Sequence, residues 1–483
     1  PVELNEREIR DSGVQGEMIV YGYLPMMISA QCIRKTTLGC SGKPEVMWLK
    51  DRKEMRFPVV NQCRFCYNTI YNSAPLSLLG LSGQVAGLKP VAIRLNFTAE
   101  EPDAVGEILD AFFEEYEMGE KAARDYFINT FLATPQKTDL AIEVMHHENK
   151  IISLSSHNSF SLYVSIPFCP TRCAYCSFVS HSIEKTHKLL EPYVDLLCKE
   201  LEKTGQVAKA LGLRLETVYF GGGTPTTLSA SQLSRLFDVI EKNFDLSTLR
   251  EYTVEAGRPD TVTEDKLMAL RGAGVGRISI NPQSFNDEVL YSIGRRHTSK
   301  QTLDAFALAR KCGFNNINMD LIAGLPKDTL SSFKNSVDTA VSLGAESVTV
   351  HTLAMKSAAY MVTRENAYDI SDKLLIFDMV EYSNSCLKSS GYYPYYMYRQ
   401  SKSVGNLENV GWCKDNMDCL YNVYMMDETH SVFAVGAGAV TRLKNQDTGK
   451  IERIYNFKYP YEYIDRFDEI IERKKLIEKF YTN

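Results

Sequence analysis

Three cysteines near the middle of the chain have the spacing of metal ligands. Cys169, Cys173 and Cys176 form a C-x3-C-x2-C pattern directly after an apolar, β-prone run at residues 162–168. Thiolates are soft ligands, which favour iron–sulfur clusters or zinc over magnesium and calcium. Three thiolates also leave one iron of a four-iron cluster without a protein ligand, so that iron could hold a small molecule. The spacing therefore predicts a metal centre with an open position.

A structural zinc site is the alternative that this spacing leaves open. His181 follows Cys176 by five residues and could complete a set of three sulfurs and one nitrogen. Pro167 and Pro170 keep the segment out of a helix and favour a turn that brings the thiols together. Both interpretations make the loop a metal site.

The elements around this loop must position it. After residue 159, strand-like runs alternate with helical patterns. Strands are expected at residues 162–168, 216–220, 251–255, 277–281, 316–322 and 347–353. Helices are expected between them at residues 189–211, 230–243, 264–271, 287–312 and 329–343. The alternation predicts an α/β fold with a parallel sheet, and six units predict an open, partial (β/α)6 barrel.

In parallel βα folds, reactive groups collect at the carboxyl ends of the strands. The chain places distinctive residues at or just beyond these ends, among them the glycine turn at residues 221–225 and Ala354. Four of them, Glu255, Gln283, Arg295 and Asp320, are candidate ligands of a polar organic cofactor. Taken singly, any of the polar residues could be a surface group or a satisfied core group. Their shared placement opposite the cysteine loop favours a pocket.

The run GGGTP at residues 221–225 follows the second expected strand. Glycines there would let a bound molecule approach the backbone and would offer it amide hydrogens, which suits a carboxylate. A tight βα turn is the alternative explanation.

The composition and charge of the chain exclude several classes of protein. The chain has 483 residues, 44% hydrophobic and 24% charged, which is typical of a globular protein of about three domains. A net charge of −6 argues against a protein that binds nucleic acids by bulk electrostatics. We find no apolar run long enough for a membrane span and no signal-peptide pattern, so we expect a cytoplasmic protein with reduced cysteines. Because the chain begins with Pro1, we expect a fragment or a processed product.

The N-terminal segment, residues 1–120, carries its own cysteines at Cys32, Cys40, Cys63 and Cys66. They could form a second iron–sulfur or zinc site, or be ordinary buried thiols. About the first 115 residues resemble the C-terminal part of the collagenase-like peptidase family, some members of which carry iron–sulfur clusters. An acidic amphipathic helix is expected at residues 98–118, with a capping box formed by Thr98 and Glu101. A connection at residues 121–158 should contain a helix at 138–149.

Several ordered motifs follow, from about residue 126 to the end. CPTRCAYC, YFGGGTPT, VEAGRPD, INPQSFND, NMDLIAGLP and GNLENVGW resemble those of the radical S-adenosylmethionine (SAM) enzymes. Within them, the chain is most similar to the oxygen-independent coproporphyrinogen III dehydrogenases of the HemN/HemZ family, and to the HemZ branch.

The resemblance implies a cofactor set. Cys169, Cys173 and Cys176 would hold three irons of a [4Fe–4S] cluster, and SAM would chelate the fourth. Positions matching the family's contacts to one or two SAM molecules are Tyr163, Gly222, Gly223, Thr224, Glu255, Gln283, Arg295, Asp320 and Ala354. Reductive cleavage of SAM would give a 5′-deoxyadenosyl radical that attacks two propionates of coproporphyrinogen III and yields protoporphyrinogen IX in haem biosynthesis. An electron donor and an electron acceptor would be needed.

One departure from the family pattern bears on the substrate. Dehydrogenases of the strict type have a further cysteine two residues after the third cluster ligand, whereas this chain has Ser177 and Phe178. Related proteins with a similar ending act as haem chaperones. Haem binding without dehydrogenase activity is therefore the alternative function.

After the expected radical SAM core at residues 159–355, residues 356–483 would form an α+β substrate domain. A helix is expected at 371–389 and another at 469–480. Between them, GYYPYYMYRQ brings Tyr392, Tyr393, Tyr395, Tyr396 and Tyr398 together with Arg399. The tyrosines could pack on a tetrapyrrole and Arg399 could pair with a propionate, although core packing is the alternative. Cys413 and Cys419 are expected to take no part.

Overall fold

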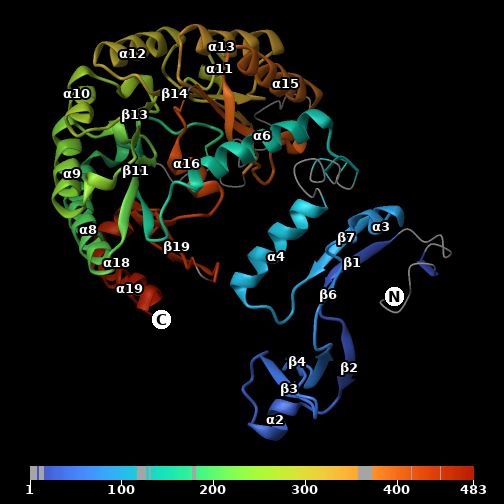
Figure 1. Ribbon diagram of the computed structural model, residues 1–483. Helices are drawn as coiled ribbons and strands as arrows, with labels where there is room; N and C mark the ends of the chain where they lie inside the picture. The colour runs from blue at the N-terminus through green and yellow to red at the C-terminus, as the bar shows by residue number, and fades with distance from the viewer. Residues whose placement is uncertain are drawn as a thin grey trace. The chain divides into compact units, whose positions relative to one another are not determined.

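The computed structural model describes residues 8–9, 16–116, 124, 127–129, 132–176, 181–356, 373–414, 416–446 and 448–482. The chain forms two compact units, residues 1–139 and 140–483 (Figure 1). The division falls inside the connection expected at residues 121–158. None of the helices in the described ranges combines the length and the apolar character that crossing a bilayer requires.

The described part of the first unit contains two small sheets. Strands β6 (Leu76–Ser77), β1 (Glu17–Gly22) and β7 (Ala92–Asn96) form one, in that order. The other is antiparallel and has the order β2 (Pro25–Ser29), β5 (Tyr67–Tyr71), β4 (Arg56–Gln62) and β3 (Val46–Lys50). The helices that accompany these two sheets are α2 (Ile33–Thr37), α3 (Ser82–Gly87) and α4 (Pro102–Glu115). Val20, Tyr21, Val85 and Phe112 form a buried core between the first sheet and helices α3 and α4.

The helix expected at residues 98–118 is α4, but its predicted cap is wrong. Helix α4 begins at Pro102, whose fixed φ and missing amide hydrogen suit the first turn of a helix. The Thr98 side chain makes no cap. Instead, the amides of Thr98 and Ala99 donate to the carboxylate of Glu100, at 2.7 and 3.0 Å. Residues 117–118 lie outside the described ranges.

The four cysteines of the first unit lie on and around the antiparallel sheet. The Cys63 thiol donates to the carbonyl of Lys43 at 2.8 Å. Burial of this thiol, and then the neighbouring Cys40, raise the pKa of Cys63. Within the described part of the chain, no three His, Cys, Asp or Glu side chains converge on one metal-ion position. A second metal centre here stays a prediction.

In the residues that the structure describes, the second unit is built on one sheet of eleven strands. Six parallel strands form its middle: β8 (Ser159–Ile166), β11 (Arg214–Gly222), β12 (Glu251–Glu255), β13 (Arg277–Ser279), β14 (Ile317–Ala323) and β15 (Ser347–Thr352). Helices α8 (Leu190–Ala210), α9 (Ala230–Asn243), α10 (Glu264–Gly272), α11 (Asp287–Ser292), α12 (Ser299–Lys311) and α13 (Leu330–Ser342) connect them. In Figure 1 these helices form an arc outside the strands. The predicted α/β fold with a partial barrel is confirmed.

The remaining strands extend the sheet at both edges. Strand β18 (Ser431–Val435) pairs in parallel with β8, and the antiparallel strands β19 (Val440–Lys444) and β20 (Ile451–Tyr455) follow it. At the other edge, β17 (Asn409–Cys413) pairs antiparallel with β15, and β16 (Tyr393–Tyr398) pairs with β17. The strands of residues 356–483 thus belong to the barrel sheet. Helices α15 (Lys373–Ser389), α16 (Leu420–Met426) and α17 (Pro460–Asp465) accompany them.

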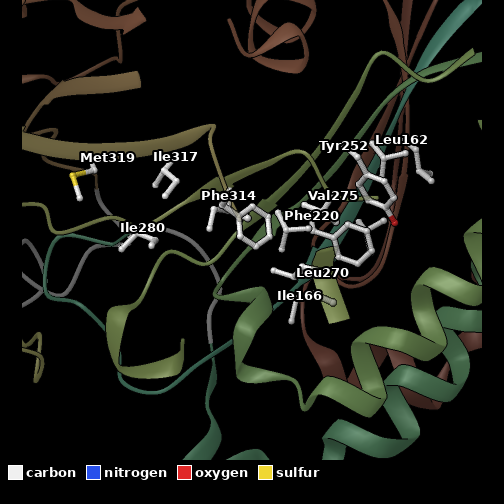
Figure 2. Close-up of a cluster of buried hydrophobic side chains, with 14 of the residues drawn as sticks. Leu162, Ile166, Phe220, Tyr252, Leu270, Val275, Ile280, Phe314, Ile317 and Met319 are labelled. Atoms are coloured by element: carbon white, nitrogen blue, oxygen red, sulfur yellow. The ribbon is translucent and has the colours of Figure 1, made fainter. Parts of the chain in front are cut away.

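Alternate residues of the parallel strands serve two different purposes. Leu162, Val218, Val254, Ile278 and their equivalents face the helices and form the hydrophobic core. Figure 2 shows part of it, with Phe220, Tyr252, Leu270 and Val275 gathered together. Successive strand residues point to opposite faces, so the residues between them point into the barrel.

Two expected helices are interrupted. The helix expected at residues 287–312 is α11 and α12, because Gly294 has φ of +76° and Thr298 starts a new helix through a capping box with Gln301. The helix expected at 469–480 is α18 (Phe467–Arg473) and α19 (Lys475–Thr482). The first break matters for function, because it places Arg295 in a loop rather than on a helix surface.

Candidate active site

A cavity of about 430 Å³ opens at the carboxyl ends of the parallel strands. All twelve residues that the sequence proposed as ligands line it. They are Cys169, Cys173, Cys176, Tyr163, Gly222, Gly223, Thr224, Glu255, Gln283, Arg295, Asp320 and Ala354. The structure therefore brings the cysteine loop and the strand-end residues to one place.

The cysteine loop is closed at its base. Strand β9 (Phe168–Cys169) pairs in parallel with β10 (His181–Ser182). The amide of His181 donates to the carbonyl of Pro167 at 2.9 Å, and the Ser182 hydroxyl donates to the carbonyl of Pro170 at 3.1 Å. Residues 177–180, which include Ser177 and Phe178, lie outside the described ranges.

The segment between α11 and α12 holds the loop from the other side. The amide of Ala174 donates to the carbonyl of Ile293 at 2.9 Å. The Arg295 guanidinium donates to the Tyr175 hydroxyl at 3.2 Å and to the carbonyl of Asn281 at 2.6 Å. Its Nε is buried and has no hydrogen-bond partner among the described residues. One donor of a buried cation thus remains for a ligand.

The glycine turn packs against the cysteine loop itself. The amide of Gly223 donates to the carbonyl of Ile166 at 2.7 Å, and that of Thr224 donates to the carbonyl of Phe168 at 2.8 Å. These two amides therefore fasten the turn to the loop, and for Gly223 the expectation that the glycine amide is offered to a bound molecule is wrong. The Thr224 hydroxyl donates to Sγ of Cys169 at 3.4 Å.

Replacing Gly223 by alanine should push the glycine turn away from the cysteine loop. The new Cβ would stand 2.6 Å from the Phe168 oxygen and 3.0 Å from Sγ of Cys169. Overpacking of this kind costs about 1–3 kcal/mol, and we expect urea denaturation to show that loss together with reduced iron content after reconstitution. Gly276→Ala is the matched control, since its Cβ would meet nothing within 4 Å. Equal stability and iron in both variants would contradict the close packing.

A carboxylate and three tyrosines form one wall. The Tyr219 hydroxyl donates to Glu255 at 2.6 Å, and the rings of Tyr163, Tyr219 and Tyr421 lie nearly parallel, with Tyr219 and Tyr421 centroids 4.4 Å apart. Burial raises the pKa of Glu255 to about 7, against the opposing effect of the Tyr219 hydrogen bond. Glu255 can therefore accept or release a proton near neutral pH.

Asp320, on the neighbouring wall, is held ionised. Asn318 donates to it at 2.7 Å, and His351 Nε2 lies 3.8 Å from its other oxygen. Burial alone would raise the pKa of Asp320, but His351 and Asn318 outweigh burial and lower it. The Tyr398 hydroxyl and His351 Nδ1 are 3.2 Å apart. The cavity thus holds one carboxylate that is protonated easily and one that is not.

Gln283 occupies a strained position between these walls. Its φ is +67°, which only a few non-glycine residues adopt. Its amide donates to the carbonyl of Asp320 at 2.9 Å, and the amide of Ile322 donates to its carbonyl at 3.0 Å. Its side-chain oxygen is buried with no partner among the described residues. The backbone therefore fixes an acceptor that a ligand could use.

Sequence reasoning missed several lining residues. They include Tyr219, Arg258, Arg277, Asn281, His351 and Tyr421. Four of these, Tyr219, Arg277, Asn281 and His351, stand on the inward face of a strand or its extension. Polar or aromatic residues at every second position of otherwise apolar strands were the signal that could have found them. Arg258 and Tyr421 had no such signal, because tertiary packing alone brings them to the cavity.

The C-terminal tyrosines divide between the cavity and the core. Tyr396 and Tyr398 line the cavity, whereas Tyr392 and Tyr395 do not and are buried. Arg399 is exposed and does not line it. Cys419, expected to take no part, is one of the lining residues, and its thiol donates to Glu251 at 3.4 Å. Ala354 is fixed by a bridge to Ser403.

The residues present fit a cluster better than zinc. His181 lies edge-on to Tyr459 and Tyr461 and does not line the cavity. In the described ranges, no three potential ligands converge on one ion, as a zinc site requires. A four-iron cluster instead takes each thiolate on a different iron. The three thiols face one cavity, beside a turn that has no room for a Cβ.

Comparison with known proteins agrees with this geometry. The sequence model of the radical SAM superfamily matches residues 163–340. The oxygen-independent coproporphyrinogen-III oxidase-like protein HemZ of Bacillus subtilis is 41% identical over 323 residues, which are 66% of this chain and 64% of HemZ. The chain thus spans slightly less than two thirds of that relative. The haem chaperone HemW of the same organism is 35% identical over 283 residues, 58% of this chain and 70% of HemW.

A solved structure supports the fold. The coproporphyrinogen III oxidase HemN of Escherichia coli, described as a radical SAM enzyme, superposes with a TM-score of 0.52 at 24% identity. The match covers 66% of this chain and 71% of HemN. With the partial barrel, the three-cysteine loop and the HemZ and HemW similarities, this chain belongs to the radical SAM superfamily, whose members carry a [4Fe–4S] cluster and SAM.

Proposed function

We propose that this protein decarboxylates coproporphyrinogen III to protoporphyrinogen IX without oxygen, in haem biosynthesis. The observation that carries the proposal is the convergence of all twelve family-matched residues on one cavity. The similarity to HemZ adds support. Each of two propionates would lose a hydrogen atom and carbon dioxide, leave a vinyl group and pass one electron to an external one-electron acceptor.

The cavity residues suit the proposed cofactors. Cys169, Cys173 and Cys176 would hold the cluster, and the other nine lining residues that the sequence indicated would contact SAM. When bound, the two supply one-electron reduction of a sulfonium and, through it, removal of a hydrogen atom from an unactivated carbon. The Nε of Arg295 suits a ligand carboxylate, and the Gln283 oxygen and ionised Asp320 suit ligand amino or hydroxyl groups.

The protein's own contribution is to orient these groups and to keep water out. Arg295 is 6% exposed and Gln283 is 6% exposed, so their interactions with a ligand would be made in a largely dry environment. Electrostatic contacts are stronger there than in water. Glu255, with its pKa of about 7, could hold a proton beside the stacked tyrosines.

Haem binding without decarboxylation is the second candidate. It is favoured by the similarity to HemW, which is a haem chaperone, and by Ser177 and Phe178 in place of a further cysteine. Tyr396 and Tyr398 on the cavity wall would then contact a tetrapyrrole.

An anaerobic assay separates the two candidates. Protein with a reconstituted cluster is incubated with SAM, a low-potential reductant and coproporphyrinogen III, and an external electron acceptor is supplied. We expect protoporphyrinogen, carbon dioxide and 5′-deoxyadenosine, measured by liquid chromatography and mass spectrometry. Stoichiometric haem binding with no decarboxylated product would reject the dehydrogenase and leave the chaperone.

A further inference from the structure

Arg258 lies beside the cysteine loop. It follows β12 and precedes a 3-10 turn, η4 (Pro259–Thr261). Its side chain is only 3% exposed. One of its terminal nitrogens, Nη1, lies 3.9 Å from Sγ of Cys173 and 3.1 Å from the Thr171 hydroxyl. A buried cation thus contacts two residues of the cysteine loop.

Asp260 fixes the orientation of this guanidinium. Nε and Nη2 of Arg258 donate to the two carboxylate oxygens of Asp260, each at 3.0 Å. Such a two-point contact holds a planar guanidinium in one orientation, which a lysine ammonium cannot match. The edge that remains, with Nη1, is therefore the one that faces Thr171 and Cys173.

The backbone that carries Arg258 is also anchored. The Thr261 hydroxyl donates to the carbonyl of Arg258 at 2.8 Å and is 2.6 Å from the hydroxyl of Thr226, in the turn that follows the three glycines. Lys266 donates to the carbonyl of Thr226 at 2.7 Å. The loop after β12 is thus tied to the glycine turn as well as to the cysteine loop.

We propose that Arg258 is a positioning residue that holds the Cys173 thiolate and raises the reduction potential of the cluster. Reduction adds negative charge to the cluster and its thiolates. A hydrogen-bond donor and a positive charge beside a ligating sulfur stabilise that added charge, and hydrogen bonds to the sulfurs are known determinants of cluster potential.

The donors to two of the cysteines differ in kind. Cys169 receives a neutral hydroxyl from Thr224 at 3.4 Å, whereas Cys173 faces two guanidiniums, those of Arg258 and Arg295. Hydrogen bonds from ionised donors are about twice as strong as those between neutral groups. Arg258 is therefore a stronger influence on the cluster than Thr224.

The test is the potential of the cluster, measured by an anaerobic redox titration followed by electron paramagnetic resonance. At the potential where the wild-type cluster is half reduced, Arg258→Met should lower the reduced-to-oxidised ratio at least tenfold, a shift of about 59 mV to more negative potential. Asp260 is 23% exposed, so water can solvate it when its partner is lost. Arg258→Lys keeps the charge and should shift the potential less.

Arg310→Met is the matched control, because it also removes a guanidinium paired with a carboxylate, that of Glu346 at 2.7 Å, on the helical layer. Its potential should equal that of the wild type. A wild-type potential in Arg258→Met, or an equal shift in Arg310→Met, would overturn the inference. If Arg258→Met retains no iron, the Arg258→Lys variant decides. A potential more negative than that of the wild type then supports the inference, and an unchanged potential overturns it.

The inference rests on the cluster and not on the tetrapyrrole substrate. The titration needs no coproporphyrinogen, so an inactive protein with a normal cluster would reject the proposed reaction and leave the Arg258 inference intact. An Arg258→Met potential equal to that of the wild type, in a protein that decarboxylates coproporphyrinogen III, would reject the Arg258 inference and leave the proposed reaction intact.

Discussion

Replacing Cys173 by serine is expected to abolish the visible absorbance of the reconstituted protein and to remove most of its iron. The Cys173 side chain is 9% exposed, and it lines the cavity with Cys169 and Cys176. A serine hydroxyl is a hard ligand that ionises far less readily than a thiol, so one iron would lose its ligand. Visible absorbance and iron per chain, both measured after anaerobic reconstitution, give the result.

Cys312→Ser is the control for this prediction. Cys312 caps the end of α12 and does not line the cavity, so its loss should leave absorbance and iron unchanged. A colourless wild-type protein that binds one zinc per chain through the three cysteines would show that the cluster assignment is wrong. Cys173→Ser protein with undiminished absorbance would show instead that the iron is held elsewhere, and the cysteines of the first unit would then be tested next.

Replacing Lys474 by methionine is expected to lower the free energy of unfolding of the second unit by about 3–5 kcal/mol. The Lys474 ammonium lies 2.7 Å from Glu200, and both side chains are buried, 3% and 0% exposed. Glu200 also accepts hydrogen bonds from the amide of Gly436 and the hydroxyl of Tyr463. Without Lys474, a buried carboxylate loses its counter-charge. Urea denaturation followed by circular dichroism measures the effect.

The adjacent lysine provides a matched control. Lys475 pairs with Glu472 at 2.6 Å, but both side chains are more than 60% exposed. Exposed pairs contribute about 0–1 kcal/mol, so Lys475→Met should change stability little. The double variant Lys474→Met with Glu200→Gln should recover part of the loss, because the unpaired charge is removed. A Lys474→Met protein as stable as Lys475→Met would show that the pair contributes nothing.

This network also bears on the site. Gly436 follows β18, where an added Cβ would stand 2.5 Å from the Tyr193 hydroxyl and 2.6 Å from the Ser165 carbonyl. Ser165 belongs to β8, the strand that leads to the cysteines. The Lys474 to Glu200 pair therefore helps to fix the strand end from which the cysteine loop departs.

The sequence by itself determined those helices and strands that residue periodicity and capping residues specify locally. The strand at Glu251–Glu255 and the helix at Ala230–Asn243 have the bounds that were expected. The strand is a short, nearly continuous β-prone run, and the helix has an apolar stripe and a capping box at Ser229. The twelve candidate ligands were also identified from the sequence and the family motifs, because parallel strands bring their carboxyl ends to one edge.

Tertiary structure decided the rest. The two amides of the glycine turn have backbone partners on the cysteine loop, and the C-terminal strands join the barrel sheet at both edges. Arg258 reaches Cys173 across 85 residues of chain. Hydrogen bonds and packing between segments so far apart leave no periodic or local signal in the sequence, since they depend on how the loops fold over the same cavity. The sequence placed the ligands at strand ends, and only the packed structure determined which other groups surround them.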